Sequence, residues 1–165
     1  MHFQKAIAID SEYCAAINEL GTVYLRVSRV DLAIQQFKEA VAAGPHRAGP
    51  YSNVAIAYLR QSSYDHAERS ARRAIGLDRG NAHSHLVLGI ALVLQKKFTV
   101  EAEKSLRRAA PDFPLAEFWL GVGQIVRGDI PSAKDQLKAY LARGPRAGAN
   151  LAKSLMEQMA AVANE

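Results

Sequence analysis

The sequence has a single cysteine, Cys14, among its 165 residues. One cysteine excludes an intramolecular disulfide and a metal site built from several thiolates, so we expect a free thiol near the start of a helix. No apolar run approaches the ~20 residues that a membrane-spanning helix requires. Met1-His2-Phe3 leads directly into a helical pattern, so no signal peptide is predicted, and the sequence assigns no compartment.

Residue groupings typical of enzymes are also lacking. His83 and His85 are two residues apart on a predicted helix, so they point to different faces, and no third zinc ligand stands at a usual spacing. Asp65-His66 with a nearby serine resembles part of a catalytic triad, but Asp65 stands where a helix is expected to begin, which favours a capping role. No glycine-rich phosphate loop occurs. The sequence therefore predicts no enzyme, no metal and no cofactor.

Aromatic residues make up only 7% of the chain and do not interleave with basic residues, which weakens the case for single-stranded nucleic acid as a ligand. The formal net charge is +5. Much of the excess lies on two predicted helices whose stacking would align a basic ridge, comprising Arg69, Arg72, Arg73, Lys104, Arg107 and Arg108. Such a ridge could meet nucleic acid or anionic lipid. A solvated outer face is the interpretation we favour.

What the sequence does contain is a helical pattern that begins near residue 17. Ile17, Leu20 and Tyr24 recur at intervals of three and four residues, which is the period of one helix face. Gly21 removes a side chain beside Leu20, so another helix can approach closely there.

A second helix follows, with Ala33, Phe37 and Ala40 on one face. Two small residues flanking a large one suit the interlocking of two antiparallel helices. Gly44-Pro45 then ends this second helix. The two helices form a hairpin that is too small to bury its own apolar face.

The hairpin pattern recurs three more times. The Leu20-Gly21 step is matched by Val54-Ala55, Leu88-Gly89 and Leu120-Gly121, at offsets of 34, 34 and 32 residues. The second helices match as well: Ala33 by Ala67, Ala102 and Ala133; Phe37 by Ala71, Leu106 and Leu137; and Ala40 by Ala74, Ala109 and Tyr140. The chain is thus built from a repeat of about 34 residues.

These positions resemble the tetratricopeptide repeat (TPR) pattern of W-x2-L-G-x2-Y, then A-x3-F, A and P, over nearly the whole chain. The large residue that opens each repeat is aromatic only at Tyr51, and Gln124 and Arg79 replace the expected Tyr and Pro. The resemblance implies an all-α, right-handed α-α superhelix of antiparallel hairpins. Its implied parts are residues 1–10 (second helix of a truncated preceding repeat), 11–47, 48–81, 82–113 (shortened) and 114–147 (four repeats), and 148–165 (a capping helix).

Helices are predicted over residues 11–28, 30–43, 50–61, 64–77, 82–95, 98–110, 114–127, 131–143 and 148–163. Phe3 aligns with Phe37, so we expect the chain to be a fragment of a longer array, with an unfinished apolar edge at its first hairpin. Ser11 is the expected N-cap of the first full hairpin. The second helix of the third repeat is expected to end about one turn early, before Pro111.

In TPR proteins the first helix of each hairpin lines a concave groove where ligands bind, and the resemblance carries that role onto matching positions. They are Asn18, Thr22, Leu25, Ser52, Asn53, Ile56, Leu59, Leu86, Ile90, Val93, Phe118, Trp119, Val122 and Ile125. The predicted groove is mixed polar at the N-terminal end and wholly apolar at the C-terminal end. A contiguous apolar groove is rarely left exposed to water, so another apolar surface is expected to pack on it. We expect, in falling order, a partner helix, an apolar peptide, a second copy, or the C-terminal helix, with Phe118 and Trp119 as hot spots.

One TPR binding mode is not expected. The carboxylate clamp for chaperone tails uses lysine, asparagine and arginine at positions matched here by Asn18, Thr22, Asn53, His83 and Val87. Only Asn53 fits. An asparagine ladder is not expected either, because Asn53 is not repeated.

The predicted function is therefore non-catalytic protein–protein recognition or scaffolding, with a protein or peptide partner of apolar or amphipathic character. Two alternatives stay open. The chain could be a structural homo-oligomer that uses the groove or its truncated end, or it could bind nucleic acid or an anionic surface through the basic ridge.

Overall fold

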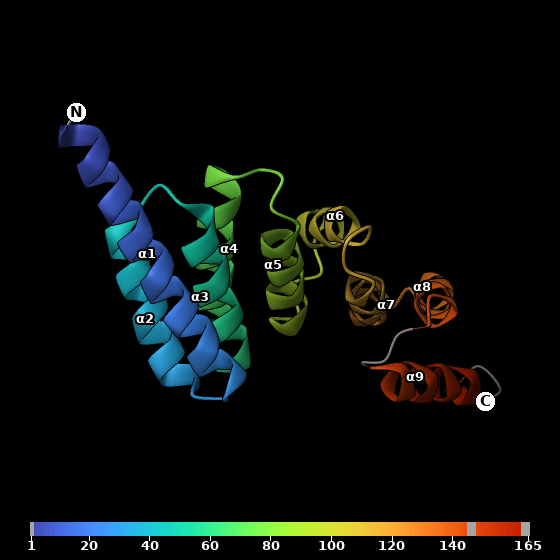
Figure 1. The fold of residues 1–165 in the computed structure, drawn as a ribbon. Coiled ribbons are helices and arrows are strands. Elements are labelled where there is room, and N and C mark those ends of the chain that lie inside the picture. The colour runs from blue at the N-terminus through green and yellow to red at the C-terminus, as the bar shows by residue number, and fades with distance from the viewer. Residues whose placement is uncertain (1, 145–147, 163–165) are drawn as a thin grey trace. The chain divides into compact units, whose positions relative to one another are not determined.

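The computed structural model describes the backbone of residues 2–144 and 148–162 and the side chains of residues 12–144 and 148–160. Within these residues the chain is all-α, with nine helices and no strand (Figure 1). None of the described helices is long and apolar enough to cross a membrane. The predicted all-α class is confirmed.

The helices group into two compact units that divide after Val87. The first unit contains α1 (His2–Arg26), α2 (Val30–Ala43), α3 (Ala48–Arg60) and α4 (Tyr64–Leu77). The second contains α6 (Val100–Ala109), α7 (Leu115–Arg127), α8 (Ile130–Ala142) and α9 (Ala149–Val162), and the unit boundary falls within α5 (Ala82–Leu94). Helices α1 and α2, α3 and α4, and α7 and α8 pack as consecutive pairs. These are the predicted hairpins.

The backbone repeats the sequence period in its turns. A residue with a left-handed conformation lies one or two positions after the end of each first helix: Ser28 at φ 59°, Ser62 at 60°, Lys96 at 58° and Gly128 at 83°. These four positions are separated by 34, 34 and 32 residues, the same spacing as the Leu-Gly steps. A left-handed residue lets a helix end abruptly and the chain reverse within a few residues. The short turns therefore set the antiparallel pairing of each hairpin.

Glycines in the first helices allow the second helices to approach closely. A Cβ atom added at Gly21 would lie 2.6 Å from the Phe37 ring, and one added at Gly121 would lie 2.8 Å from Leu137. Both large side chains are fully buried. Contacts this short are not compatible with van der Waals packing, so the close approach requires glycine at these positions.

The predicted separate helix over residues 1–10 is not observed. Helix α1 begins at His2 and continues without a break to Arg26, so Ser11 lies inside a helix and is not its N-cap. The later junctions between one hairpin and the next, such as residues 44–47, 78–81 and 110–114, contain proline, glycine or asparagine, whereas residues 4–16 contain none of these. Without such a breaker, the local helix propensity extends the first helix instead of ending it.

The short second helix of the third hairpin is observed as predicted. Helix α6 has 10 residues, whereas α2 and α4 have 14 each. It begins after Thr99, whose side chain caps the helix by accepting a hydrogen bond from the Ala102 backbone N–H. It ends at Ala109, two residues before Pro111.

Candidate functional site

The first helices of the first unit, α1 and α3, are joined by polar contacts. Asn53 Nδ2 donates a hydrogen bond to Asn18 Oδ1 at 2.9 Å, and the Arg60 guanidinium donates to the Leu25 carbonyl oxygen, also at 2.9 Å. Both bonds span 35 residues, so they link equivalent regions of neighbouring repeats. Thr22 Oγ1 donates to the Asn18 carbonyl oxygen within α1 at 3.1 Å.

Most of the predicted groove residues of this unit are accessible. Asn18, Thr22, Asn53, Ile56 and Leu59 are half-buried, and we call these five the first-helix surface. They combine two amides, a hydroxyl and two aliphatic side chains on two neighbouring helices. This composition suits a peptide that presents both main-chain polar groups and apolar side chains.

The other two groove positions of the first unit are buried. Leu25 is 9% exposed and Ser52 is 4% exposed. The Ser52 hydroxyl oxygen has no hydrogen-bond partner among the described residues. These two side chains therefore support the surface from beneath.

The C-terminal half of the predicted groove is not open. Leu86, Ile90 and Val93 of α5 are 7%, 8% and 3% exposed, and Phe118 of α7 is 5% exposed. The prediction that these side chains line an open groove is wrong. Their apolar character reflects core packing.

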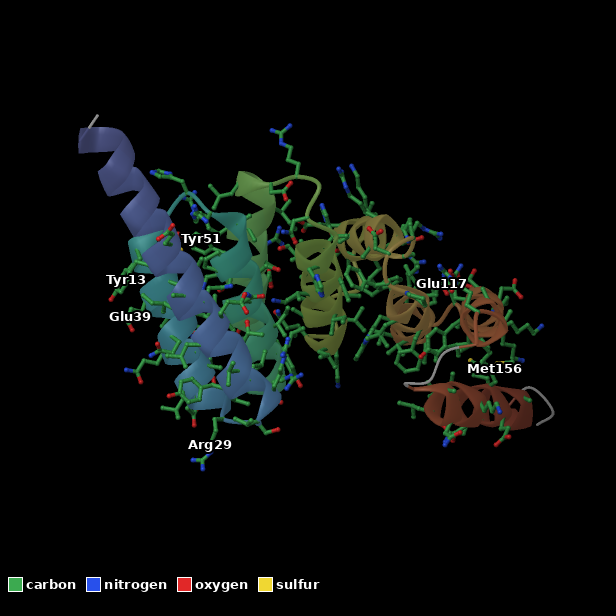
Figure 2. All side chains as sticks on the ribbon, in the orientation of Figure 1. Tyr13, Arg29, Glu39, Tyr51, Glu117 and Met156 are labelled. Atoms are coloured by element: carbon green, nitrogen blue, oxygen red, sulfur yellow. The ribbon has the colours of Figure 1, made fainter. Side chains whose placement is uncertain are left out.

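Phe118 is buried in a cluster that includes the C-terminal helix. The cluster joins Phe118 to Leu137 and Tyr140 of α8 and to Ala152 and Met159 of α9. The rings of Phe118 and Tyr140 lie 5.6 Å apart. In Figure 2, the labelled Met156 lies on the side of α9 that faces α8, in agreement with its packing against this cluster. The C-terminal helix thus contributes to the core around Phe118, and what covers the predicted groove as a whole stays a prediction.

Three further groove positions on α7 stay partly accessible. Trp119, Val122 and Ile125 are half-buried and pack against the same cluster. The Trp119 ring meets Phe118 edge to face, with ring centroids 5.6 Å apart. Part of the Trp119 side chain therefore contributes to core packing.

The basic residues predicted to form a ridge are all exposed, and two of them form ion pairs. Arg72 pairs with Glu68 at 2.9 Å, and Arg107 pairs with Glu103 at 2.8 Å. The hydrogen bond from Arg107 lowers the pKa of the Glu103 carboxyl below its usual value. These pairs reduce the positive field that an anionic ligand would meet. Alignment of all six residues into one ridge stays a prediction, because they lie on helices of different units.

The candidate catalytic and metal-binding residues have structural surroundings. The His66 ring packs on Tyr58, with centroids 4.9 Å apart. Asp65, the predicted cap, lies in the first turn of α4, two residues after the N-cap position Ser63. His85 Nε2 lies 3.1 Å from the Arg79 carbonyl oxygen, whereas His83 is exposed. Across the described part of the chain, no group of three or more His, Cys, Asp or Glu side chains could hold a metal ion.

A pocket that was not predicted from the sequence lies beside Asn18. It has a volume of about 190 Å³ and is lined by residues of α1, of the α2–α3 connection and of the start of α3, namely Cys14, Ala15, Asn18, Glu19, Arg47, Gly49 and Pro50. The Cys14 thiol is buried and donates to the Ala40 carbonyl oxygen at 3.2 Å. The lining residues belong to two repeats, so only the 34-residue offset of Ala15 and Gly49 hinted that they meet.

Comparison with known proteins agrees with this architecture. Residues 54–117 match the tetratricopeptide repeat family. The chain is 29% identical over 101 residues to the E3 ubiquitin-protein ligase CHIP of Arabidopsis thaliana, and 29% identical over 93 residues to RNA polymerase II-associated protein 3 of Xenopus laevis. These matches cover 61% and 56% of this chain but only 36% and 14% of those proteins. The chain therefore spans a minor part of the length of both relatives.

Solved structures show the same fold. PilF of Pseudomonas aeruginosa superposes with a TM-score of 0.76 at 21% identity, covering 91% of this chain and 68% of that one. YrrB, described as a TPR protein with an unusual peptide-binding site, gives 0.74 at 19% identity, covering 94% and 80%. The first TPR domain of Spaghetti (RPAP3), bound to the HSP90 peptide SRMEEVD, gives 0.66 at 25% identity, covering 71% and 95%.

The repeat pattern, the helical hairpins and these matches agree. Residues 54–117 match tetratricopeptide repeats, and the chain has the fold of the TPR solenoids. The comparisons indicate no enzymatic family for it.

Proposed function

We propose that the chain is a non-catalytic protein–protein interaction module that binds a peptide or an amphipathic helix on its first-helix surface. The observation that carries this proposal is the Asn18–Asn53 hydrogen bond, which fixes two amide side chains on neighbouring helices. Asn18 still has its amide N–H groups and Asn53 its amide oxygen, and no further hydrogen bond joins these atoms to the described residues. A peptide group carries one donor and one acceptor, so it can satisfy both amides together.

Ile56 and Leu59 supply the apolar part of the surface. Both are half-buried on α3, three residues apart, so they lie on the same side of that helix. A ligand with apolar side chains three or four residues apart would match them. In the second unit, Trp119, Val122 and Ile125 of α7 are partly accessible and are candidate contacts in their own right.

The relatives support a peptide ligand. The RPAP3 domain structure contains an HSP90 peptide, and YrrB is described by its peptide-binding site. Both have the fold of this chain. The proposal transfers to this chain the class of ligand and not its sequence.

The test is to select random peptides displayed on phage against the immobilised chain and to measure the affinity of the enriched peptides by isothermal titration calorimetry. Asn53→Ala is expected to weaken binding by about tenfold, since one buried hydrogen-bonding pair is worth about 1.4 kcal/mol. Ile56→Asp is expected to weaken it by roughly 30-fold or more, because a charge replaces an apolar contact.

Two matched controls keep the test specific. Ile75→Asp makes the same change at a half-buried position of the second helix α4, and Asn150→Ala removes an exposed amide from α9. Both are expected to leave peptide affinity unchanged. Equal losses from Ile56→Asp and Ile75→Asp, or enriched peptides insensitive to Asn53→Ala and Ile56→Asp, would refute the first-helix surface as the binding site.

The HSP90 peptide SRMEEVD is expected not to bind. The positions that match the cationic members of a carboxylate clamp hold Asn18, His83 and Val87, and Val87 is only 2% exposed. An acidic tail would therefore find no lysine or arginine fork to neutralise it. Fluorescence anisotropy with a labelled peptide should show no saturation below about 1 mM. The RPAP3 domain serves as the positive control, and saturable binding to this chain would contradict the prediction.

A further inference from the structure

Helix α1 carries an apolar stripe that the first unit leaves open to solvent. Its members recur at intervals of three and four residues: Tyr13, Ala16, Leu20, Val23 and, just after the helix end, Val27. The four large side chains are between 43% and 61% exposed. Figure 2 shows the labelled Tyr13 on the side of the α1–α2 hairpin away from α3. This spacing is that of the a and d positions of a helix that packs along another helix.

The equivalent positions of later first helices are buried. In α3, the counterparts of Ala16, Leu20 and Val23 are Pro50, Val54 and Ala57, and all three are buried where α3 packs on α2. In α7, the counterparts are Ala116, Leu120 and Gly123, which are likewise buried in a helix that packs on α6. This face of a first helix therefore receives another helix at both places, and at α1 the described residues provide none.

We propose that a second copy of this chain covers the stripe, with the two α1 helices packed antiparallel. In that arrangement Leu20 of one copy can lie opposite the partner's Val23, and Ala16 opposite the partner's Val27. The small Ala16 side chain leaves room for the larger valine, as close helix packing requires.

The charges beside the stripe fit this arrangement. Glu19 and Arg26 are exposed, seven residues apart and therefore on the same side of α1. The antiparallel register brings Glu19 of each copy within reach of the partner's Arg26, which gives two symmetric ion pairs. A parallel pair would place Glu19 beside the partner's Tyr24, so neither ion pair would form. The charge order thus selects the antiparallel orientation.

The self-association surface is separate from the proposed ligand surface. At 100° per residue, Leu20 points to the side of α1 opposite Thr22 and Asn18. Each copy contributes essentially one helix, so the buried area is at the small end for specific interfaces. We therefore expect a dissociation constant of roughly micromolar order.

The first test is sedimentation equilibrium of the full chain from about 1 to 200 μM, a range chosen to bracket that affinity. We expect the mass to rise from monomer to dimer. Leu20→Asp is expected to weaken dimerisation by at least about 100-fold, as for a central apolar anchor. Leu151→Asp, at a position of α9 that is 55% exposed, is the matched control and should dimerise normally. Both variants should keep the helical circular dichroism spectrum, because both positions are exposed.

The second test is a charge swap. Glu19→Arg and Arg26→Glu alone should each weaken the dimer by roughly tenfold, because each change converts two ion pairs into like-charge contacts. The double variant should regain most of the affinity, since the pairs are then reversed. A chain that stays monomeric, or a dimer that ignores Leu20→Asp, would overturn the proposal. Failure of the double variant to recover would overturn the antiparallel register. Peptide binding through Asn53 should be unaffected in every variant.

Discussion

Replacing Phe118 with aspartate is expected to unfold the second unit. Phe118 is 5% exposed and packs in one cluster with side chains of α8 and α9. Truncating a buried phenylalanine costs about 3–5 kcal/mol, and an unpaired carboxylate in the same site adds to that. A loss of this size is comparable to the whole stability of many domains. The measurement is chemical denaturation followed by circular dichroism and by Trp119 fluorescence.

The control is Val126→Asp on the same helix. Val126 is 44% exposed, so the same charge there stays hydrated. Its effect is expected to be within about 0.5 kcal/mol, as for ordinary surface substitutions. If Phe118→Asp leaves the stability intact and abolishes only ligand binding, then Phe118 is a surface hot spot and the core assignment fails.

A comparison of Phe118 with Ile56 explains how much of the binding surface the sequence could predict. Apolar residues at intervals of three and four identified the helices and their apolar faces, because that periodicity is a local property. Both Phe118 and the half-buried Ile56 satisfy it. Which of them stays accessible depends on contacts with distant parts of the chain. The cluster around Phe118 includes side chains of α8 and of α9, and α9 begins more than 20 residues after α7 ends. Periodicity alone contains no information about that contact.

The prediction of a separate helix over residues 1–10 was wrong because it used long-range information and neglected local sequence. Aligning Phe3 with Phe37 used the long-range repeat and disregarded the local sequence. Residues 4–16 contain no proline, glycine or asparagine, and local helix propensity continues α1 through the expected junction. A repeat alignment marks where a junction belongs, but the later junctions between hairpins also contain a proline, glycine or asparagine that ends the helix, and this one does not.

The Asn18–Asn53 contact was within reach of the sequence. The two residues are 35 apart, one more than the repeat length, so they occupy adjacent positions on neighbouring first helices. Pairs of polar residues separated by one repeat are therefore candidates for contacts between repeats. The same offset relates Arg60 to Leu25.

Replacing Phe37 with alanine is expected to destabilise the first unit by about 3–5 kcal/mol, because the ring is fully buried and leaves a cavity. Gly21 determines how much of that loss can be recovered. In the wild-type chain, Gly21→Ala would place a Cβ 2.6 Å from the Phe37 ring, and overpacking of this kind costs about 1–3 kcal/mol. In the Phe37→Ala background that clash is gone.

The chain itself contains the combined arrangement. Ala55 and Ala71 occupy the positions that match Gly21 and Phe37, and both are fully buried. The effect of Gly21→Ala on the free energy of unfolding should therefore change sign between the two backgrounds. It should destabilise the wild-type chain but stabilise the Phe37→Ala variant by up to about 1 kcal/mol, since alanine is the better helix former and fills part of the cavity. A double-mutant cycle from urea denaturation measures this coupling. Additive effects of the two substitutions would contradict the direct contact between Gly21 and Phe37.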